Sequence, residues 1–408
     1  MIRWITPFLG TAPAGSPDIS PDIQVVDVRD LVDKNGNNLD AIRLKIEQGT
    51  ALLEAGQRLV VCCDYGISRS NSIAAGILFR HGAMSFDAAV REVRRTTGEN
   101  EIKLEPLNAV RAALRADEPV PKLDGLRVLI TGGSGFIGSA LSGALEGAAF
   151  VLAPSRAQAD LSAGAVALDL LVKEHRINTL VHLANPRIYT SAQATGDAVT
   201  MLRNALDVCR ENGLRLIFLS GWEVYSGYRS VDLLADETLP TLPKGPYGEA
   251  KMLCETLIGH YRQLHGLDAV IVRSSPVYGI GSDRPKFIYN FLDKARRGAP
   301  IQTHCYLNGS PQLDLLHIDD LQSALLSILT SDASGDFNVG TSQMTSTLVI
   351  ASAIVERTQS ASKVVQHPIA DYAPNIRMDY TRVRKILGWE PSWSISDGLD
   401  QIIMQGKT

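Results

Sequence analysis

Two loops, each lying between an apolar strand-like run and a helix-like run, most constrain the fold of this chain of 408 residues. The first is Cys63-Asp64-Tyr65-Gly66-Ile67-Ser68-Arg69, which follows the apolar run 58–62. The second follows the run 127–131 and places Gly132, Gly135 and Gly138 three residues apart. Because N–H groups at the start of a helix favour anions, both loops predict phosphate-binding sites. Two sites of different type indicate at least two domains.

The order of the apolar runs predicts an α/β fold for both parts of the chain. In the first part the expected strands are 24–28 and 58–62, and the expected helices are 39–54, 70–81 and 86–97. In the second part strands and helices alternate, which is typical of a doubly wound parallel sheet of the Rossmann type. We expect an N-terminal domain at 1–116, a linker at 117–125 and a C-terminal domain at 126–408, in which the Rossmann part covers about 126–275 and a small substrate-binding part lies mainly at 276–408.

Composition narrows the class of protein. The net charge of −4 gives no basic surface for nucleic acid. No apolar run reaches the roughly 18 residues of a membrane span, and the N-terminus lacks the apolar core of a signal peptide. The five cysteines have no metal-binding spacing and no framework of pairs. We therefore expect a cytoplasmic protein with free thiols, no metal site, no nucleic-acid partner and no membrane partner.

The chemistry of the first loop depends on Cys63. Loop amides and a helix N-terminus lower the pKa of a cysteine, which gives a thiolate that can attack phosphorus. Arg69 can hold two phosphate oxygens in its planar fork, Gly66 permits the tight turn, and Ser70 can hydrogen-bond the thiolate. Two other interpretations stay open: a buried structural cysteine beside a solvated arginine, and a phosphate-binding loop without turnover.

The pattern of a cysteine, five residues, an arginine and a serine resembles the dual-specificity branch of the protein tyrosine phosphatases, over about residues 20–115. The resemblance implies Cys63, Arg69 and Ser70 as catalytic residues of a phosphatase-like α/β domain. It also implies an upstream aspartate as the general acid, and Asp33 is the candidate because it lies six residues before the helix expected from 39.

Two points within this resemblance stay open. Asp30 is the rival of Asp33 for the role of the general acid. The family usually has histidine immediately before its nucleophile, and this chain has Cys62 there. The departure implies either lower activity or oxidative trapping of Cys63 by Cys62.

The second loop is joined by a pair far downstream. Tyr247 and Lys251 lie four residues apart and share one face of a helix expected over about 247–264. The ordinary pKa of a tyrosine phenol is about 10, and a lysine ammonium beside it favours the phenolate. Tyr247 could then exchange a proton with a substrate hydroxyl or carbonyl while hydride moves to or from a nicotinamide. Without a glycine loop, such a pair would be an ordinary helix-surface pair.

These motifs together resemble the extended short-chain dehydrogenase/reductases, the family of sugar-nucleotide epimerases, dehydratases and reductases, over about residues 126–403. Other segments that carry the likeness are 182–184, 275–279, 317–320, 337–340 and 387–391. The resemblance implies NADP or NAD as the cofactor, a sugar or nucleotide-sugar as the substrate, and a homodimer formed through the two long helices that flank the sheet.

The resemblance also assigns the cofactor-binding residues, which are Gly132, Gly135, Phe136, Ile137, Gly138, Ser155, Arg156, Asp160, Leu161, Leu183, Ala184, Tyr247 and Lys251. NAD-dependent enzymes place an acid at the end of the second strand for the ribose hydroxyls. The run 151–156 has no acid there and ends in Ser155 and Arg156, which suit a 2′-phosphate. NADP is therefore favoured over NAD.

The sequence departs from the family at positions that would contact the substrate. The family has Ser or Thr three residues before the Val of its Val-Tyr-Gly segment, and that position is Gly221 here. Either Ser220 supplies the hydroxyl as a catalytic residue, or the hydroxyl is missing. Glu223 stands where the dehydratases and decarboxylases of the family carry an acid, and the alternative is a solvated charge. Leu313 replaces a phosphate-contacting arginine, whereas Arg377 matches another one, so a weakened diphosphate grip is expected.

The sequence thus predicts a bifunctional enzyme. Its C-terminal domain would act on a sugar or nucleotide-sugar with NAD(P), as an epimerase, reductase or dehydratase. Its N-terminal domain would remove phosphate from a phosphorylated metabolite through a phosphocysteine at Cys63. Two alternatives for the N-terminal domain stay open: a phosphotyrosine phosphatase that regulates a partner protein, and a phosphate-binding module without catalysis.

Overall fold

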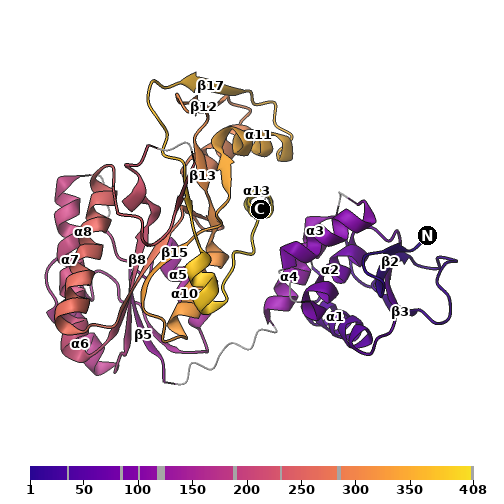
Figure 1. Ribbon diagram of the computed structural model, residues 1–408, viewed down its shortest axis with the longest axis horizontal. Coiled ribbons are helices and arrows are strands. Elements are labelled where there is room, and N and C mark those ends of the chain that lie inside the picture. Colours follow the sequence, from indigo (N-terminus) through magenta and orange to yellow (C-terminus); the bar gives the residue numbers. More distant parts are fainter. Residues whose placement is uncertain are drawn as a thin grey trace. The chain divides into compact units, whose positions relative to one another are not determined.

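The computed structural model describes residues 1–34, 36–82, 86–99, 102–116, 125–186, 191–229, 232–282 and 286–405. The chain forms two compact units, which we call the N-terminal unit (Met1–Val120) and the C-terminal unit (Pro121–Thr408) (Figure 1). Of the expected linker 117–125, only Gly125 lies within the described residues. The two units are described separately below.

The N-terminal unit is a four-stranded sheet covered by four helices. The strands, in the spatial order β1-β2-β4-β3, are β1 (Arg3–Trp4), β2 (Leu9–Pro13), β4 (Leu59–Cys63) and β3 (Gln24–Asp27). The helices are α1 (Leu39–Glu54), α2 (Arg69–His81), α3 (Phe86–Thr97) and α4 (Leu104–Ala116). The central strand β4 is parallel to both β2 and β3, and its carboxyl end leads through the first loop into α2. This unit therefore presents Cys63 at the end of a strand that is paired on both sides.

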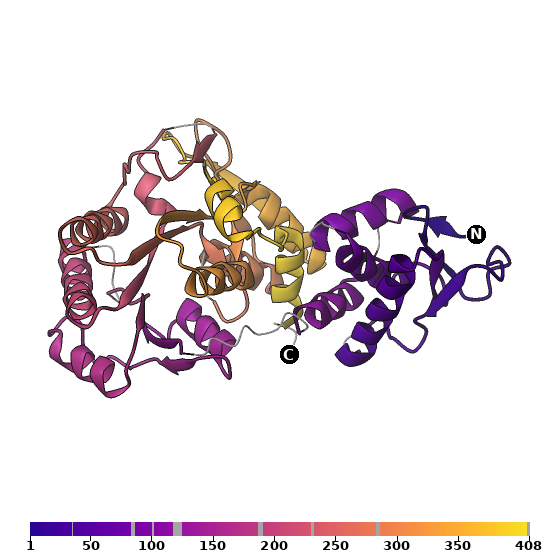
Figure 2. The ribbon, with the colours of Figure 1, turned by 60° about the horizontal axis from the view of Figure 1, so that its bottom comes forward.

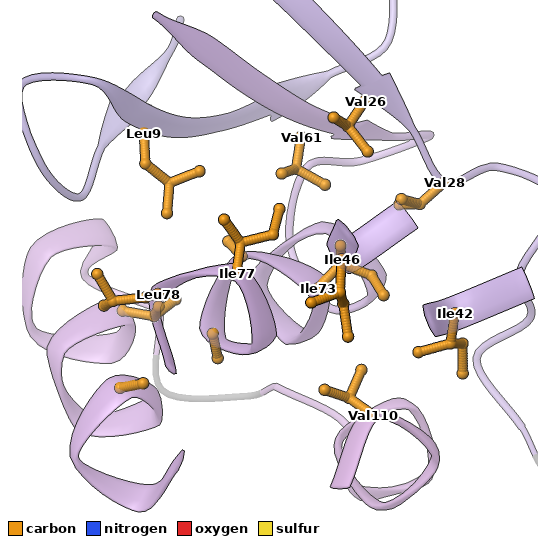
Figure 3. Close-up of a cluster of buried hydrophobic side chains, with 14 of the residues drawn as sticks. Leu9, Val26, Val28, Ile42, Ile46, Val61, Ile73, Ile77, Leu78 and Val110 are labelled. Atoms are coloured by element: carbon orange, nitrogen blue, oxygen red, sulfur yellow. The ribbon is translucent and has the colours of Figure 1, made fainter. Parts of the chain in front are cut away.

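The core of the N-terminal unit fixes α2 beneath β4. Apolar residues at helical spacing, such as Ile42 and Ile46 of α1 and Ile73 and Ile77 of α2, belong to the same buried cluster as Val61 of β4 (Figure 3). Small residues let the helices approach closely: a Cβ on Gly76 would lie 2.8 Å from the Cδ1 atom of Ile46. Because interiors are close-packed, this contact holds the middle of α2 closely against α1.

The C-terminal unit contains an all-parallel sheet of six strands. In spatial order they are β15 (Gly335–Val339), β10 (Ala269–Ser274), β8 (Arg215–Gly221), β7 (Thr179–His182), β5 (Arg127–Thr131) and β6 (Phe150–Leu152). From β5 the chain moves to one neighbour, β6, and then returns to the other neighbour, β7. The strand order thus reverses at β5, and ligands of such sheets bind at the carboxyl ends of the strands at this switch point.

Helices cover both faces of this sheet (Figure 1). One face packs against α6 (Val166–Glu174), α7 (Ala192–Asn212) and α8 (Pro246–His265). The other packs against α5 (Phe136–Leu145), α10 (Ile318–Leu329) and α12 (Thr381–Leu387). The central strands β7, β8 and β10 are buried almost throughout, which explains why they have continuous apolar runs instead of alternating ones. The expected doubly wound parallel sheet is confirmed.

The later part of the chain also builds a smaller subdomain with its own core (Figure 2). Its elements are α9 (Lys286–Arg296), α11 (Thr347–Arg357), α13 (Ile395–Gln405), the pair β12 (Ile301–Cys305) and β17 (Val364–Pro368), and the pair β13 (Gln312–Asp314) and β16 (Met344–Ser346). Short pairs β9 (Leu233–Ala235) with β18 (Ile376–Met378), and β11 (Val277–Tyr278) with β14 (Leu316–His317), adjoin it. Among the described residues, no helix combines the length and apolar character needed to cross a membrane.

Candidate functional site

The first loop wraps around the sulfur of Cys63. The backbone N–H of Gly66 donates to Cys63 Sγ at 3.1 Å, and the thiol and the Ser70 hydroxyl are hydrogen bonded at 3.4 Å. Gly66 has a φ of +70°, and a Cβ there would lie 2.5 Å from the carbonyl carbon of Ala12. Only glycine satisfies both the conformation and the space, so the turn that directs amides at the sulfur depends on it.

The two adjacent cysteines have opposite environments. Burial acts to raise the pKa of Cys63, but the Ser70 hydroxyl and the N–H groups of Ser70, Tyr65 and Ile67 outweigh it and hold this pKa below its ordinary value. Burial raises the pKa of Cys62 to about 11. Cys63 packs in the core beneath the helices, and Cys62 packs with Val60 on the opposite face of the sheet. Neighbouring strand residues point to opposite faces, so oxidative trapping of Cys63 by Cys62 would require this end of the strand to rearrange.

Arg69 is held in a defined orientation by four groups. Its Nη1 donates to the carbonyl oxygens of Leu31 at 2.8 Å and Arg29 at 3.3 Å, and its Nη2 donates to Asp64 Oδ2 at 2.5 Å. Its Nε, which has no hydrogen-bond partner among the described residues, lies 3.5 Å from Asp33 Oδ1. The guanidinium is thus fixed next to the thiol loop, and a carboxylate already occupies part of its fork.

The structure separates the two candidate general acids. The Asp33 carboxylate lies beside Arg69 and 3.6 Å from Lys103 Nζ. The Asp30 carboxylate pairs instead with Lys45 Nζ at 2.9 Å. Of the two, Asp33 is the one that the fold brings to the thiol loop.

The second loop joins β5 to α5 at the switch point of the parallel sheet. Gly132 has a φ of +74°, and a Cβ there would lie 2.8 Å from the Ala184 nitrogen. A Cβ on Gly133 would lie 2.5 Å from Ala153 Cβ, and one on Gly138 would collide with the Gly132 carbonyl oxygen. The N-cap Gly135 provides no side chain to satisfy the first N–H groups of α5. The loop is therefore a glycine-rich cradle at the N-terminus of a helix, which fits the diphosphate of a dinucleotide.

The residues that we expect to contact the adenosine half of the cofactor lie after β6 and β7. Arg156 is exposed, and its Nε donates to Asp160 Oδ2 at 3.0 Å. Ser155 Oγ donates to Gln158 Oε1 at 2.8 Å. Leu161 belongs to the core beneath α7, whereas Leu183 continues β7 by donating its N–H to the Thr131 carbonyl at 3.1 Å. The fold thus places Leu183 and Ala184 directly beside the glycine loop.

Tyr247 and Lys251 lie in the first turns of α8, beside the carboxyl end of β8. Lys251 Nζ donates to the Leu219 carbonyl at 2.7 Å and lies 5.6 Å from the centre of the Tyr247 ring. Burial lowers the pKa of Lys251, although Cys254, Glu223 and Glu255 act to raise it. The strand carbonyl thus fixes a cation next to the tyrosine. Because β5 and β8 are parallel strands of one sheet, this pair and the glycine loop share the same sheet edge.

Ser220 belongs to a buried ion-pair network. Its hydroxyl donates to Glu255 Oε1 at 2.5 Å, and Glu255 Oε2 accepts from Arg273 Nη2 at 2.7 Å. All three side chains are buried. The single hydroxyl proton of Ser220 is therefore used inside the protein.

Glu223 lies in the 3₁₀ turn η1 (Trp222–Tyr225), which follows β8 and packs on α8. Its carboxyl group folds back over Gly221, so that a Cβ on Gly221 would collide with Glu223 Oε2. Protein atoms surround the carboxyl group closely although part of the side chain stays accessible, and this desolvation raises the pKa of Glu223 to about 7, against the lowering effect of Lys251. Sequence reasoning assigned Glu223 to the substrate but gave no signal for this contact with Gly221.

The two phosphate-related positions differ in their surroundings. Arg377 of β18 donates to Asp232 through Nε at 2.7 Å and Nη2 at 2.9 Å. Leu313 lies in β13.

Sequence reasoning missed a surface pocket of about 430 Å³ that includes Arg229 and Lys244 among its lining residues. Among the described residues, no cluster of three or more His, Cys, Asp or Glu side chains is arranged to hold a metal ion.

Comparison with known proteins places the C-terminal unit in a family. Residues 128–340 match the family described as the NAD dependent epimerase/dehydratase family. The chain is 28% identical over 311 residues to UDP-glucose 4-epimerase of Mycolicibacterium smegmatis, covering 68% of this chain and 97% of that protein. It is 27% identical over 247 residues to the low-salt glycan biosynthesis protein Agl12 of Haloferax volcanii, covering 60% of this chain and 76% of that protein.

Solved structures share the fold of this family at low sequence identity. The Thermus thermophilus UDP-glucose 4-epimerase in complex with NAD aligns with a TM-score of 0.62 and 23% identity, covering 69% of this chain and 99% of that chain. The Pseudomonas aeruginosa protein RMD in complex with NADPH aligns with a TM-score of 0.61 and 21% identity, covering 69% and 100%. The match of the family over more than half of the sequence, on a Rossmann-type sheet with an intact glycine cradle, shows that the chain belongs to the NAD dependent epimerase/dehydratase family, whose members use NAD or NADP.

Proposed function

We propose that the C-terminal unit transfers hydride at a hydroxyl-bearing carbon of a nucleotide-sugar or related sugar derivative, in an epimerase, dehydratase or reductase reaction. The observation that carries this proposal is the fixed pair of Tyr247 and Lys251 at the same sheet edge as the glycine cradle. The relatives support the substrate class, because they include a UDP-glucose 4-epimerase and UDP-glucuronic acid decarboxylase 2 of Arabidopsis thaliana.

The residues of the chain have separate tasks in this reaction. When bound, the nicotinamide supplies an acceptor or donor for hydride. Tyr247 takes the proton of the substrate hydroxyl as the carbon loses hydride, or returns it in the reverse step. The ammonium group of Lys251, held by the Leu219 carbonyl, stabilises the phenolate form of Tyr247. The N–H groups at the start of α5 hold the cofactor diphosphate.

The two positions that correspond to phosphate-contacting arginines indicate which compounds to test as substrates. Leu313 cannot pair with phosphate, and Arg377 is already engaged by Asp232 in two hydrogen bonds. A nucleotide diphosphate would have to compete with Asp232 for this arginine. The panel should therefore contain UDP-glucose, UDP-glucuronic acid and dTDP-glucose together with simple sugar phosphates. Turnover or a change in nicotinamide absorbance with one of them supports the proposal, and none with any of them, from protein that binds NAD(P), contradicts it.

We propose that NADP is preferred over NAD because Arg156 lies exposed after β6, where the 2′-phosphate of the cofactor would lie. Replacing Arg156 by alanine is expected to weaken NADPH binding about tenfold or more and to leave NADH binding nearly unchanged, since a hydrogen bond to a charged group contributes about 1.5–3 kcal/mol. The exposed pair with Asp160 offers little resistance to this exchange of partners. Fluorescence titration of both cofactors measures the difference.

Lys173→Ala is the matched control for this prediction, because Lys173 forms a similar exposed ion pair with Asp169 on α6. Equal weakening of NADPH and NADH binding by Arg156→Ala would contradict the assignment of the 2′-phosphate site.

We further propose that the N-terminal unit is a cysteine-dependent phosphatase acting on a phosphorylated metabolite. Cys63 Sγ bonds to phosphorus as the ester P–O bond breaks, and Asp33 gives its proton to the leaving oxygen. Water then attacks phosphorus, the P–S bond breaks with Ser70 stabilising the departing thiolate, and Asp33 accepts the water proton. Arg69 and the loop N–H groups hold the phosphate oxygens in both steps.

Phosphate release from sugar phosphates and from a phosphotyrosine peptide distinguishes the alternatives for this site. Faster turnover of the sugar phosphates supports the proposal. Faster turnover of the peptide favours a protein phosphatase that regulates a partner. Phosphate binding without a phosphocysteine burst indicates a binding module, and it contradicts a catalytic role.

Asp64 bears on this site because its carboxylate occupies the Nη2 side of the Arg69 fork at 2.5 Å. A phosphate must displace or approach this negative charge. Replacing Asp64 by asparagine is therefore expected to tighten the binding of inorganic phosphate or vanadate by about three- to tenfold, since the Asp64 carboxylate is half-exposed and partly screened by solvent. Titration calorimetry measures the affinity.

Asp18→Asn provides the control, because Asp18 is an exposed carboxylate of the same unit that pairs with the N-terminal amine at 3.0 Å. If Asp64→Asn weakens anion binding, then the carboxylate positions Arg69 instead of competing with the anion.

A further inference from the structure

We propose that Glu223 is a catalytic residue that replaces the hydroxyl missing at position 221, donating a hydrogen bond to the substrate oxygen that exchanges its proton with Tyr247. This inference rests on the proposed hydride-transfer function of the C-terminal unit. In this arrangement residue 221 has no side chain, and the carboxyl group of Glu223, two residues downstream, occupies the place that a side chain at position 221 would take.

Glycine at position 221 leaves room for the carboxyl group of Glu223. Its backbone is extended, with a φ of −160° and a ψ of 168°, which any residue adopts. Conformation therefore does not require glycine there. A Cβ on Gly221 would, however, need the place of Glu223 Oε2, so the carboxyl group at the end of this flexible side chain would have to move to admit one. The carboxyl oxygen lies where the Ser or Thr side chain of a hydroxyl-bearing relative would begin.

The turn that carries Glu223 lies beside the start of α8, where Tyr247 is located. The turn η1 that carries Glu223 packs on the first residues of α8, and a Cβ on Gly248 would lie 2.5 Å from the Glu223 carbonyl oxygen. Gly248 follows Tyr247 directly in the sequence, and the charge of Lys251 reaches the Glu223 carboxyl group. The turn that carries Glu223 thus packs against the start of the helix that bears the proposed catalytic pair, and its carboxyl group feels the charge of Lys251.

To donate a hydrogen bond, the Glu223 carboxyl group must carry a proton. A protonated carboxyl group has an O–H donor, as a hydroxyl does. Desolvation raises the pKa of Glu223 to about 7, so a large fraction carries a proton at neutral pH. The backbone N–H of Glu223, the charge of Lys251 on α8 and the side chain of Trp222 act to lower this pKa, while Glu255 farther along α8 is paired with Arg273. The alternative donor, Ser220, already donates to Glu255 at 2.5 Å.

In this reaction Glu223 acts only as a hydrogen-bond donor and neither gains nor loses a proton. In the oxidative direction, the substrate carbon gives its hydride to the bound cofactor, and its hydroxyl proton moves to Tyr247. Glu223 keeps its own proton and hydrogen-bonds the oxygen as this oxygen changes from hydroxyl to carbonyl. In the reductive direction the same donor polarises the carbonyl while hydride arrives.

The test moves the hydroxyl back to its position in the family. Four variants are compared: Glu223→Ala, Glu223→Gln, Gly221→Thr, and the double variant Gly221→Thr with Glu223→Ala. The single-turnover rate of nicotinamide reduction is measured with whichever of UDP-glucose, UDP-glucuronic acid or dTDP-glucose the wild type oxidises. Glu223→Ala is expected to lower the rate by about 10²-fold. The double variant is expected to recover to within about tenfold of the wild type, because the threonine hydroxyl introduced by Gly221→Thr restores a donor.

A second readout does not depend on activity. Gly221→Thr alone is expected to lower the thermal unfolding temperature, because its side chain collides with Glu223, and removal of the Glu223 side chain in the double variant should restore that temperature. In addition, Glu223→Gln keeps a donor that does not titrate. Its rate should therefore lack the decline above about pH 7 that the wild type shows as Glu223 loses its proton.

The outcomes separate this inference from the function on which it rests. A wild type that binds NAD(P) but reduces it with none of the three nucleotide-sugars overturns the proposed function and, with it, the inference. A wild type that turns over while Glu223→Ala stays within twofold of it overturns only the inference. So does a folded double variant that is no faster than Glu223→Ala.

Discussion

Replacing Tyr247 by phenylalanine is expected to lower the rate of nicotinamide reduction by about 10²- to 10⁴-fold, because the variant loses the group that exchanges the substrate proton. Phenylalanine keeps the aromatic ring that Lys251 faces at 5.6 Å. Lys251 also keeps its hydrogen bond to the Leu219 carbonyl, so the cation stays in place. The unfolding temperature and the affinity for NAD(P) should therefore change little. Stopped-flow absorbance with a saturating nucleotide-sugar measures the rate.

Tyr65→Phe is the matched control, because Tyr65 is a largely exposed tyrosine of the N-terminal unit. It should reduce nicotinamide at the rate of the wild type. A Tyr247→Phe enzyme that stays within tenfold of the wild type would show that another group carries the proton. Loss of cofactor binding in the variant would instead indicate a structural role.

Replacing Cys63 by serine is expected to abolish phosphate release, with a loss on the order of 10⁴- to 10⁶-fold, as for removal of other covalent nucleophiles. The loop holds the pKa of Cys63 below its ordinary value despite burial, which increases the fraction of thiolate at any given pH. As the pH falls through this pKa, the sulfur gains a proton. The rate of phosphocysteine formation should therefore decline toward acidic pH. Burst kinetics with sugar phosphates and with a phosphotyrosine peptide measure this rate.

Cys62→Ser is a sharp control for this prediction, since it changes the adjacent residue in the same strand. Cys62 points to the opposite face of the sheet, and burial raises its pKa to about 11. Its serine variant should therefore keep the phosphatase rate. Equal loss in both variants would assign the effect to folding, and no loss in Cys63→Ser would exclude the phosphocysteine route.

The regular elements follow from local patterns, and the missed ones show where such patterns fail. Helices α1 and α3 have the predicted boundaries, and α2 and the strands β3 and β4 differ from their predictions by a single residue at one or both ends. Strand β2 was not predicted, because its sequence Leu-Gly-Thr-Ala-Pro contains residues with low strand propensity. Its pairing with β4 supplies the stability that its own residues lack. Helix α4 was missed in a stretch with Pro106 near its start and charged residues before the linker.

The candidate sites divide in the same way. The loops that follow β4 and β5 are predictable, because a strand, a glycine turn and a helix are local in sequence. Contacts between distant residues are not. The two hydrogen bonds from Arg377 to Asp232 join positions that are 145 residues apart. The hydrogen bond from Ser220 to Glu255 depends on the packing of α8 against β8.

The central claim is that the C-terminal unit removes hydride from a sugar carbon. The most direct test incubates the wild-type protein and NAD(P) with UDP-glucose, UDP-glucuronic acid and dTDP-glucose that carry deuterium at every ring carbon, and follows the label by mass spectrometry. We expect deuterium to appear in the reduced nicotinamide, or to return to the sugar in an altered product, with at least one of them. Protein that binds the cofactor and leaves both the label and every sugar unchanged would contradict the account.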